Sequence, residues 1–357
     1  MGDLIKEWER RQHEKAGVLQ PVTARELQEM ELPELEYVVD KILPKGVAVL
    51  AAKPKRGKSM LALDMCLSIC NGFDFLGYKT KQGACLYFDI ESSKRRPKDR
   101  MDKMLKGRQA PDNLYFITMD ELWTDDEKML IGAGFEQQLA NLLTYYPEIQ
   151  LVVIDILAKV RQSKTSKTDD YERDYRDFGA LIKIANDFNV CILCVMHNTK
   201  MEHADPFDDI QGSAGVMGSL DTAMVIQTRN TTDNEAALHI RGRDIEEQKL
   251  IITFDRGSCR WMKRGTAEEV ERQQMELDYA KSNVIKTVFA LLGDDNTWTG
   301  SATDIKTASV YNGTPVSINV STIGVELMRF RDLLGCEGVT FSKSKKSKKN
   351  IYTFVRE

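Results

Sequence analysis

The stretch VAVLAAKPKRGKSMLALDMCLSIC, residues 47–70, decides how the rest of the chain is interpreted. Its apolar run over 47–52 predicts a buried strand, and the apolar pattern from Lys58 onward predicts a helix. The loop between them follows the P-loop pattern GxxxxGK plus Ser or Thr, except that Ala52 stands where the first glycine is expected. In such a loop the backbone N–H groups and the helix N-terminus surround a phosphate group. The sequence therefore predicts a site for ATP.

The predicted nucleotide-binding residues are those of the loop and the start of the helix: Ala52, Lys53, Pro54, Lys55, Arg56, Gly57, Lys58, Ser59 and Met60. Lys58 is expected to reach the β- and γ-phosphates of ATP, and the Ser59 hydroxyl is expected to ligate Mg²⁺. The departure at Ala52 weighs against the motif, because alanine resists a positive φ. A strand, turn and helix without a ligand is the alternative. We favour the P-loop because strand and helix flank the loop as phosphate binding requires.

Further apolar runs predict an α/β fold. They cover 84–90, 114–118, 151–155 and 190–196, and helical patterns lie between them. Continuous apolar strands that alternate with helices indicate a parallel sheet covered on both faces. After Gly215 apolar runs follow one another without helices, which indicates antiparallel strands at one side of the sheet. We therefore expect a mainly parallel central sheet extended by antiparallel strands.

The chain divides into three expected parts: a polar arm over 1–35, an ATPase domain over 36–264 and a small domain over 265–357. In the last part, helical patterns precede two short strands that are joined by a lysine-rich turn. The helix expected over 321–334 has one apolar stripe, as a helix packed on a core requires. This order of elements predicts a winged helix-turn-helix domain.

Composition narrows the class of protein. The net charge of −4 argues against coating of nucleic acid, although it leaves room for local basic loops. No apolar run approaches the roughly 20 residues that cross a bilayer, and the N-terminal segment has no apolar core. We therefore expect a cytoplasmic protein without a membrane partner.

Most of the seven cysteines lie in apolar runs, so Cys191 and Cys194 are interpreted as core thiols although their spacing is CxxC.

Two acids are candidates for the chemistry of ATP. Asp155 ends the run LVVID, where a carboxylate at the tip of a strand can serve as the second magnesium ligand. Because Ile156 follows it, the base that activates water must come from elsewhere. Glu91 lies two residues after Asp89, on the same face, and would be next to the P-loop if the two strands are neighbours. The alternative is that Glu91 is a surface acid.

His197 directly follows the buried run 190–196, at the height where a parallel sheet presents its ligand-facing loops. It is a candidate sensor of the γ-phosphate. A satisfied histidine at a strand end is the equally weighted alternative. His197 and His203 are too isolated from other ligand types to indicate zinc.

Several motifs in order carry a family resemblance: PKRGKS, LYFDIES, LVVID, CVMHNTK and DPFDDIQGSAGVMGSLDTAMVI. Over about residues 36–262 the chain resembles the RecA-like ATPases of the hexameric plasmid and phage replicative helicases, of the RepA type. The resemblance implies that Glu91 activates water, that His197 senses the nucleotide, and that an arginine from the next subunit completes the site. Arg243, with Arg241 as the alternate, occupies the matching segment. Both are otherwise interpreted as exposed charges at the ends of strands.

Contacts to single-stranded DNA are expected from two loops that follow Asp155 and His197. Basic side chains in these loops could neutralise backbone phosphates without reading bases. The candidates are Lys159, Arg161, Lys164, Lys167 and Lys200. A solvated charged loop is the alternative. The equally basic segment 91–108 is interpreted as a solvated or subunit-facing surface.

The leading interpretation is a ring-forming, hexameric, DNA-stimulated ATPase that acts as a helicase in replication of a mobile element, with other replication proteins as further partners. The last region is similar to the winged-helix tails of mobile-element helicase and primase proteins, and its turn over 343–349 carries five lysines. Two alternatives stay open. One is an ATP-switched DNA-binding initiator or loader without unwinding activity. The other is a recombinase-like filament former.

Overall fold

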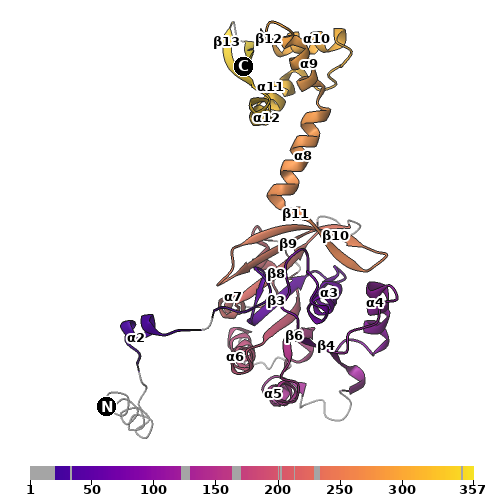
Figure 1. Cartoon of the computed structure of the whole chain (residues 1–357), viewed down its shortest axis with the longest axis vertical. Helices are drawn as coiled ribbons and strands as arrows, with labels where there is room; N and C mark the ends of the chain where they lie inside the picture. The colour runs from indigo at the N-terminus through magenta and orange to yellow at the C-terminus, as the bar shows by residue number, and fades with distance from the viewer. Residues whose placement is uncertain are drawn as a thin grey trace.

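A computed structural model describes residues 21–32, 34–121, 129–162, 170–199, 201, 203–212, 214–228, 234–346 and 349–357. Two bodies are seen in Figure 1, a large α/β core and a smaller C-terminal unit, with helix α8 between them. A short helix, α2 (Ala24–Glu29), precedes the core and begins with a capping box formed by Thr23 and Glu26. No helix within the described ranges is long and apolar enough to cross a membrane.

The core is built on a nine-stranded sheet with the order β11-β10-β9-β8-β3-β7-β6-β4-β5. The parallel strands are β3 (Gly46–Ala52), β4 (Ala84–Asp89), β5 (Leu114–Thr118), β6 (Ile149–Asp155), β7 (Cys191–His197) and β8 (Thr222–Gln227). The antiparallel extension consists of β9 (Glu235–Gly242), β10 (Gln248–Asp255) and β11 (Arg260–Thr266). This arrangement confirms the expected α/β fold class. A short ribbon of β1 (Tyr37–Val39) and β2 (Leu43–Pro44) precedes the sheet.

Helices cover both faces of the sheet, as the alternating side chains of β3 show. Ala48 and Leu50 belong to the apolar cluster that contains α3 (Lys58–Asn71) and the end of α4 (Arg95–Leu105). Val47 and Val49 belong to the cluster on the other face, formed with α5 (Phe135–Tyr145), α6 (Asp170–Phe188) and α7 (Ala214–Ser219). Because successive side chains of a strand point to opposite faces, both faces need apolar residues. The continuous apolar runs of the sequence follow from this.

Strand β4, which precedes Glu91, is not a direct neighbour of the P-loop strand β3. We expected Glu91 to lie by the P-loop if its strand were the neighbour of the P-loop strand. In the structure β7 and β6 lie between β3 and β4. The chain nevertheless turns toward the P-loop after β4, because the backbone N–H of Ile90 donates to the carbonyl of Asp155 at the end of β6, at 3.1 Å.

The C-terminal unit has its own core. Helix α8 (Ala267–Lys281) leads to this unit and contributes Tyr279 to its core. The unit itself contains α9 (Asn283–Leu292), β12 (Thr297–Ser301), α10 (Ala302–Tyr311), α11 (Val320–Arg329), α12 (Arg331–Cys336), β13 (Val339–Lys346) and β14 (Lys349–Arg356). Its sheet has the order β12-β14-β13. The expected apolar stripe at Ile323, Leu327, Phe330 and Leu334 is buried in this core. Helix α8 follows β11 without a gap and begins with a capping box of Thr266 and Glu269.

Candidate active site

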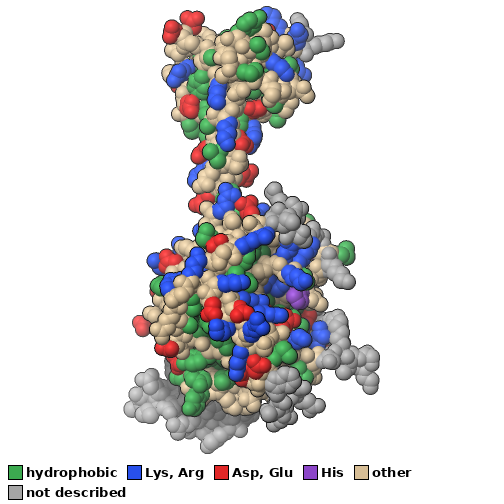
Figure 2. Space-filling model, turned by 90° about the vertical axis from the view of Figure 1, so that its right-hand side faces the viewer, with side chains coloured by type: hydrophobic (Ala, Val, Ile, Leu, Met, Phe, Trp, Pro, Cys, Tyr) green, Lys and Arg blue, Asp and Glu red, His purple; other side chains and the backbone are tan. Residues whose placement is uncertain are grey.

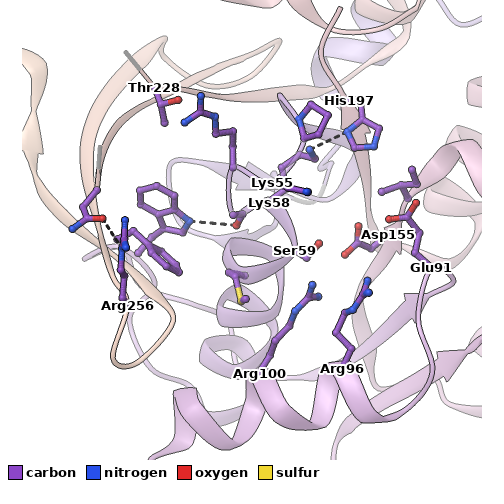
Figure 3. A pocket seen from close by; sticks show the side chains of 18 residues that line it. Lys55, Lys58, Ser59, Glu91, Arg96, Arg100, Asp155, His197, Thr228 and Arg256 are labelled. Carbon is purple, nitrogen blue, oxygen red and sulfur yellow. Dashed lines mark hydrogen bonds between the residues drawn. The ribbon is translucent and has the colours of Figure 1, made fainter. Parts of the chain in front are cut away.

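A cavity of about 630 Å³ opens at the carboxyl edge of the parallel strands. It is lined by the loop from Pro54 to Met60 and by residues that follow three other parallel strands. Those residues are Glu91, Asp155, Ile156 and His197. Figure 3 shows Lys58, Ser59, Glu91, Asp155 and His197 around one space in front of α3. The structure therefore brings together the residues that the sequence predicted for ATP, Mg²⁺ and water activation, and their roles stay predictions.

The P-loop backbone accommodates the missing first glycine. Ala52 is the last residue of β3 and pairs in register with His197, so its backbone is that of a strand. The positive φ angles of the loop lie at Lys55 (60°) and Gly57 (80°). A side chain at Gly57 would also meet Trp261, since a Cβ built there lies 2.8 Å from the indole Nε1. Glycine is therefore needed at position 57 and not at position 52.

Lys58 is buried at the start of α3. Its Nζ donates to the carbonyls of Ala52 at 2.9 Å and Lys53 at 3.2 Å, and it lies 3.2 Å from Nδ1 of His197. Burial lowers the pKa of Lys58 to about 8, while the charges of Asp155 and Glu91 oppose that change. Burial and the Lys58 charge lower the pKa of His197. A neutral His197 can accept from the ammonium through Nδ1.

Asp155 and Ser59 fit a magnesium site by their chemistry. Asp155 ends β6, is 4% exposed, and lies opposite the Ser59 hydroxyl across the pocket in Figure 3. Oxygen ligands of this kind are those that Mg²⁺ takes beside a triphosphate. The Tyr87 hydroxyl donates to Oδ2 of Asp155 at 2.7 Å, and burial raises the pKa of Tyr87 so that it stays a donor. Tyr87 was not predicted, because within an apolar strand its pattern indicates a core aromatic.

A second buried carboxylate lies beside Asp155. Asp89 ends β4 in register with Asp155 and is 3% exposed. Its Oδ2 has no hydrogen-bond partner among the residues that the structure describes. Burial raises the pKa of Asp89, and the Asp155 charge adds to that rise. This edge of the sheet therefore concentrates negative charge that a cation can neutralise.

The sequence did not connect two arginines with the P-loop cavity. We interpreted the basic segment 91–108 as a solvated or subunit-facing surface. In the structure Arg96 and Arg100 of α4 line the cavity, and Figure 3 shows both guanidinium groups pointing toward Ser59 and Asp155. No local pattern indicated this, because the side of α4 that faces the cavity depends on how the helix packs on the sheet.

The far side of the cavity is formed by the antiparallel extension, which the sequence did not connect with the P-loop. Trp261 of β11 donates from Nε1 to the carbonyl of Gly57 at 3.3 Å, and its ring packs on Phe254 with centroids 5.1 Å apart. Arg256 donates from Nε to Oδ1 of Asn234 at 3.0 Å. Phe254, Arg256 and Asn234 line the cavity together with Trp261.

Neither candidate for the arginine from a neighbouring subunit lines the cavity of its own chain. Arg241 is held by Asp205 at 2.8 Å and Glu247 at 2.9 Å, and its guanidinium lies over the Phe207 ring at 4.2 Å. The Arg243 side chain is 57% exposed; it donates to the carbonyl of Gly218 and lies 3.7 Å from Asp221. Arg243 is thus the more available of the two for a group outside its own subunit.

The expected DNA contacts are only partly within the described residues. Lys159 is exposed at the end of a 3-10 helix, Leu157–Lys159. Arg161 contradicts the expectation of a DNA-facing side chain: it is 10% exposed and forms ion pairs with Asp174 and Asp177, which are themselves buried. Lys164, Lys167 and Lys200 lie outside the described residues. Removing Arg161 would take the closest cation from two buried carboxylates, so its first role is structural.

The CxxC pair lies inside the sheet. Cys191 and Cys194 are fully buried in β7, and burial raises the pKa of both thiols, to about 12 for Cys194. Buried thiols with a raised pKa are poor nucleophiles and poor metal ligands. Within the described ranges, no group of three or more His, Cys, Asp or Glu side chains is arranged to hold a metal ion.

A family model described as an AAA domain, AAA_25, matches residues 12–203, which is more than half of the chain. No curated protein sequence matches. One solved structure, described by its title as an ATPase domain, is 11% identical with a TM-score of 0.47, covering 61% of this chain and 84% of that one. "The Structure Of A DnaB-Like Replicative Helicase And Its Interactions With Primase" is 12% identical with a TM-score of 0.48, covering 61% of this chain and 57% of that one. At TM-scores below 0.5, neither likeness supports a statement about activity.

Proposed function

Because the chain belongs to the AAA domain family AAA_25, we propose that it hydrolyses ATP and uses the energy to move along single-stranded DNA as a replicative helicase. The observation that carries the ATPase part is the meeting of Lys58, Ser59, Asp155 and Glu91 around one cavity at the P-loop. Each of these groups comes from the carboxyl edge of the sheet, where α/β proteins bind their ligands. The helicase part rests on the order of the motifs along the chain.

In the proposed reaction the phosphates of ATP lie against the backbone N–H groups at the start of α3. Lys58 exchanges its carbonyl acceptors in Ala52 and Lys53 for phosphate oxygens. Ser59 and Asp155 would hold Mg²⁺, which supplies positive charge next to the phosphates. Glu91 accepts a proton from the attacking water. His197, in contact with Lys58, registers whether the γ-phosphate is present.

We propose that Arg243 completes the site of the adjacent copy in a ring of identical subunits. Its exposed side chain and its absence from the lining of its own cavity support this role, since an arginine that acts between subunits must be able to reach outward. Arg241 is less suited, because two carboxylates and an aromatic ring already hold it. Assembly would then control hydrolysis.

DNA binding is proposed for the loops that face the centre of the ring and for the C-terminal unit as a winged helix. Lys159 is the described member of the first set. In the C-terminal unit, the hairpin of β13 and β14 presents Lys343, Lys345, Lys346 and Lys349 to solvent. Such contacts neutralise phosphates, so binding should weaken steeply with salt. Other replication proteins remain expected partners.

Three measurements test the proposal. ATP turnover with and without single-stranded DNA should show stimulation by DNA, and a forked duplex should be unwound only with hydrolysable ATP. Electron microscopy with ATP and single-stranded DNA should show closed rings. DNA-stimulated turnover without strand displacement would instead support the initiator or loader. Helical filaments would support the recombinase-like alternative, and a lack of any ATP turnover would end the proposal.

A further inference from the structure

Helix α4 and its N-cap residue carry two kinds of basic side chain. Some are paired with nearby acids: Lys94 with Glu121 at 2.5 Å, Arg95 with Asp99 at 3.7 Å, and Lys98 with Asp102 at 2.6 Å. Arg96 and Arg100 differ, because their side chains form no hydrogen bond or ion pair with any residue in the described ranges. They are four residues apart and therefore lie on one face of the helix. Two guanidinium groups thus lie on one face of the helix with no ion-pair partner among the described residues.

The face that carries these arginines is turned toward the P-loop. Pro97 and Met104 are buried against the sheet and fix how the helix packs. Arg96 and Arg100 line both the P-loop cavity and an adjoining cavity of about 460 Å³. On this side of the core, Lys and Arg side chains gather around acidic ones (Figure 2). In the close view both guanidinium groups point to the space between Ser59, Asp155 and Glu91 (Figure 3).

The net charge of this space becomes more negative when a nucleotide binds. Before binding, the two arginines line the cavity together with Glu91 and Asp155, and their charges reach the buried Asp89. A triphosphate adds several negative charges at the same place. A guanidinium has a planar set of donors that matches phosphate oxygens, and it keeps its charge at any physiological pH. Arg96 and Arg100 therefore meet the requirements of a phosphate clamp.

We propose that Arg96 and Arg100 are catalytic residues that bind the terminal phosphate of ATP from within the same subunit. The inference rests on the proposed ATP hydrolysis. In that reaction the water oxygen bonds to the γ-phosphorus, and the bond from the γ-phosphorus to the bridging oxygen of ADP breaks. Glu91 takes the proton of the water. The two guanidinium groups neutralise charge on the γ-phosphoryl oxygens and then hold the phosphate product, beside the adjoining cavity through which it can leave.

The experiment compares a double variant, Arg96→Gln with Arg100→Gln, with the matched control Lys98→Gln. The control removes a charge from the same helix, but Lys98 is exposed, paired with Asp102, and outside both cavities. Calorimetry measures the affinities for ADP and for a non-hydrolysable ATP analogue. The double variant should keep its affinity for ADP and lose about 10- to 100-fold for the triphosphate, the range of lost charged hydrogen bonds. Its single-turnover rate should fall, while the control matches the wild type.

Mixing separates action within a subunit from action between subunits. Double-variant subunits mixed with Lys58→Ala subunits should stay inactive, because every intact P-loop then lacks its own arginines. Activity that returns on mixing would overturn the assignment to the same subunit. An unchanged preference for triphosphate over ADP, with normal turnover, would overturn the phosphate contact itself. If the double variant unfolds, the variants Arg96→Lys and Arg100→Lys are used instead. They keep the positive charge but lose the planar set of guanidinium donors, and they must still lower the turnover. Normal turnover in Lys58→Ala would instead reject the P-loop proposal.

Discussion

The core and the C-terminal unit differ in what they bury. In the described part of the core, most buried charged side chains lie at the edge of the sheet that carries the P-loop or around Arg161: Lys58, Asp89, Asp155, Asp174 and Asp177. Asp64 is buried against Arg260, and Asp209 beside His203. Among the described residues of the C-terminal unit, the buried polar side chains are hydroxyls: Ser282, Thr287, Ser301 and Ser309. Burying a charge costs free energy unless it is paired, so a chain keeps such groups where they have a task. The comparison favours the core as the place of the chemistry.

Lys58→Ala tests the core side of this comparison most directly. The variant should lose ATP turnover completely and keep its fold, because the lysine ammonium contacts backbone carbonyls and not the apolar core. Steady-state ATPase assays and thermal unfolding measure the two effects. Normal turnover would remove the P-loop from the mechanism.

Arg243→Ala should bind ATP normally and turn it over about 10³- to 10⁵-fold more slowly, the range of arginines that act between subunits. Mixing it with Lys58→Ala should restore part of the activity, since some interfaces then pair an intact P-loop with an intact arginine. Arg241→Ala is the control that tests the alternate residue. If mixed rings form and their activity equals that of the separate variants, Arg243 does not act on the neighbour.

Glu91→Gln should assemble and bind ATP but hydrolyse it about 10²- to 10⁴-fold more slowly, because an amide cannot accept the proton. Asp155→Asn should instead weaken binding that depends on Mg²⁺. Nucleotide affinity with and without Mg²⁺ distinguishes the two. Equal loss of affinity in both variants would show that the roles are not divided in this way.

The affinity for ATP should depend on pH through Lys58, whose pKa burial lowers to about 8. As the pH rises through 8, the unliganded protein loses the ammonium that phosphate oxygens require, so the affinity should fall by up to about tenfold per pH unit. In Lys58→Arg this dependence should disappear, because a guanidinium stays charged. Calorimetric titrations between about pH 7 and 9.5 measure it, and a flat profile in the wild type contradicts it.

Removing residues 267–357 should have the smallest effect on ATP binding. The C-terminal unit has its own apolar cluster, and none of its residues lines the P-loop cavity. The shortened chain should therefore bind ATP within about twofold of the full chain while it loses affinity for DNA. An insoluble product, or one that does not bind nucleotide, would show that the two bodies fold as one.

The sequence could predict the parts of the site that local pattern places. Lys58, Asp155 and His197 each end or follow an apolar strand, and parallel strands present their carboxyl ends at one edge. Arg100 and Trp261 could not be placed in this way. Trp261 meets Gly57 across 204 residues, and only the folding of the antiparallel extension over α3 brings them together.

Arg161 was predicted to contact solvent and DNA because it lies in a basic loop, but the structure buries it. The acids that pair with it lie 13 and 16 residues later, within α6. Nothing local in the sequence shows that this turn of the helix faces the loop. The winged-helix assignment of the C-terminal unit and the function of its lysines likewise stay predictions, since they depend on what binds there.

The uneven burial of the cysteines has a practical consequence. All seven are free thiols; six are buried in the core, and Cys336 is exposed at the end of α12. A thiol reagent should therefore modify one cysteine per folded chain and all seven once the chain unfolds. Cys336 offers a single attachment point for a fluorophore on the C-terminal unit, and the slow labelling of the other six measures how often the core opens.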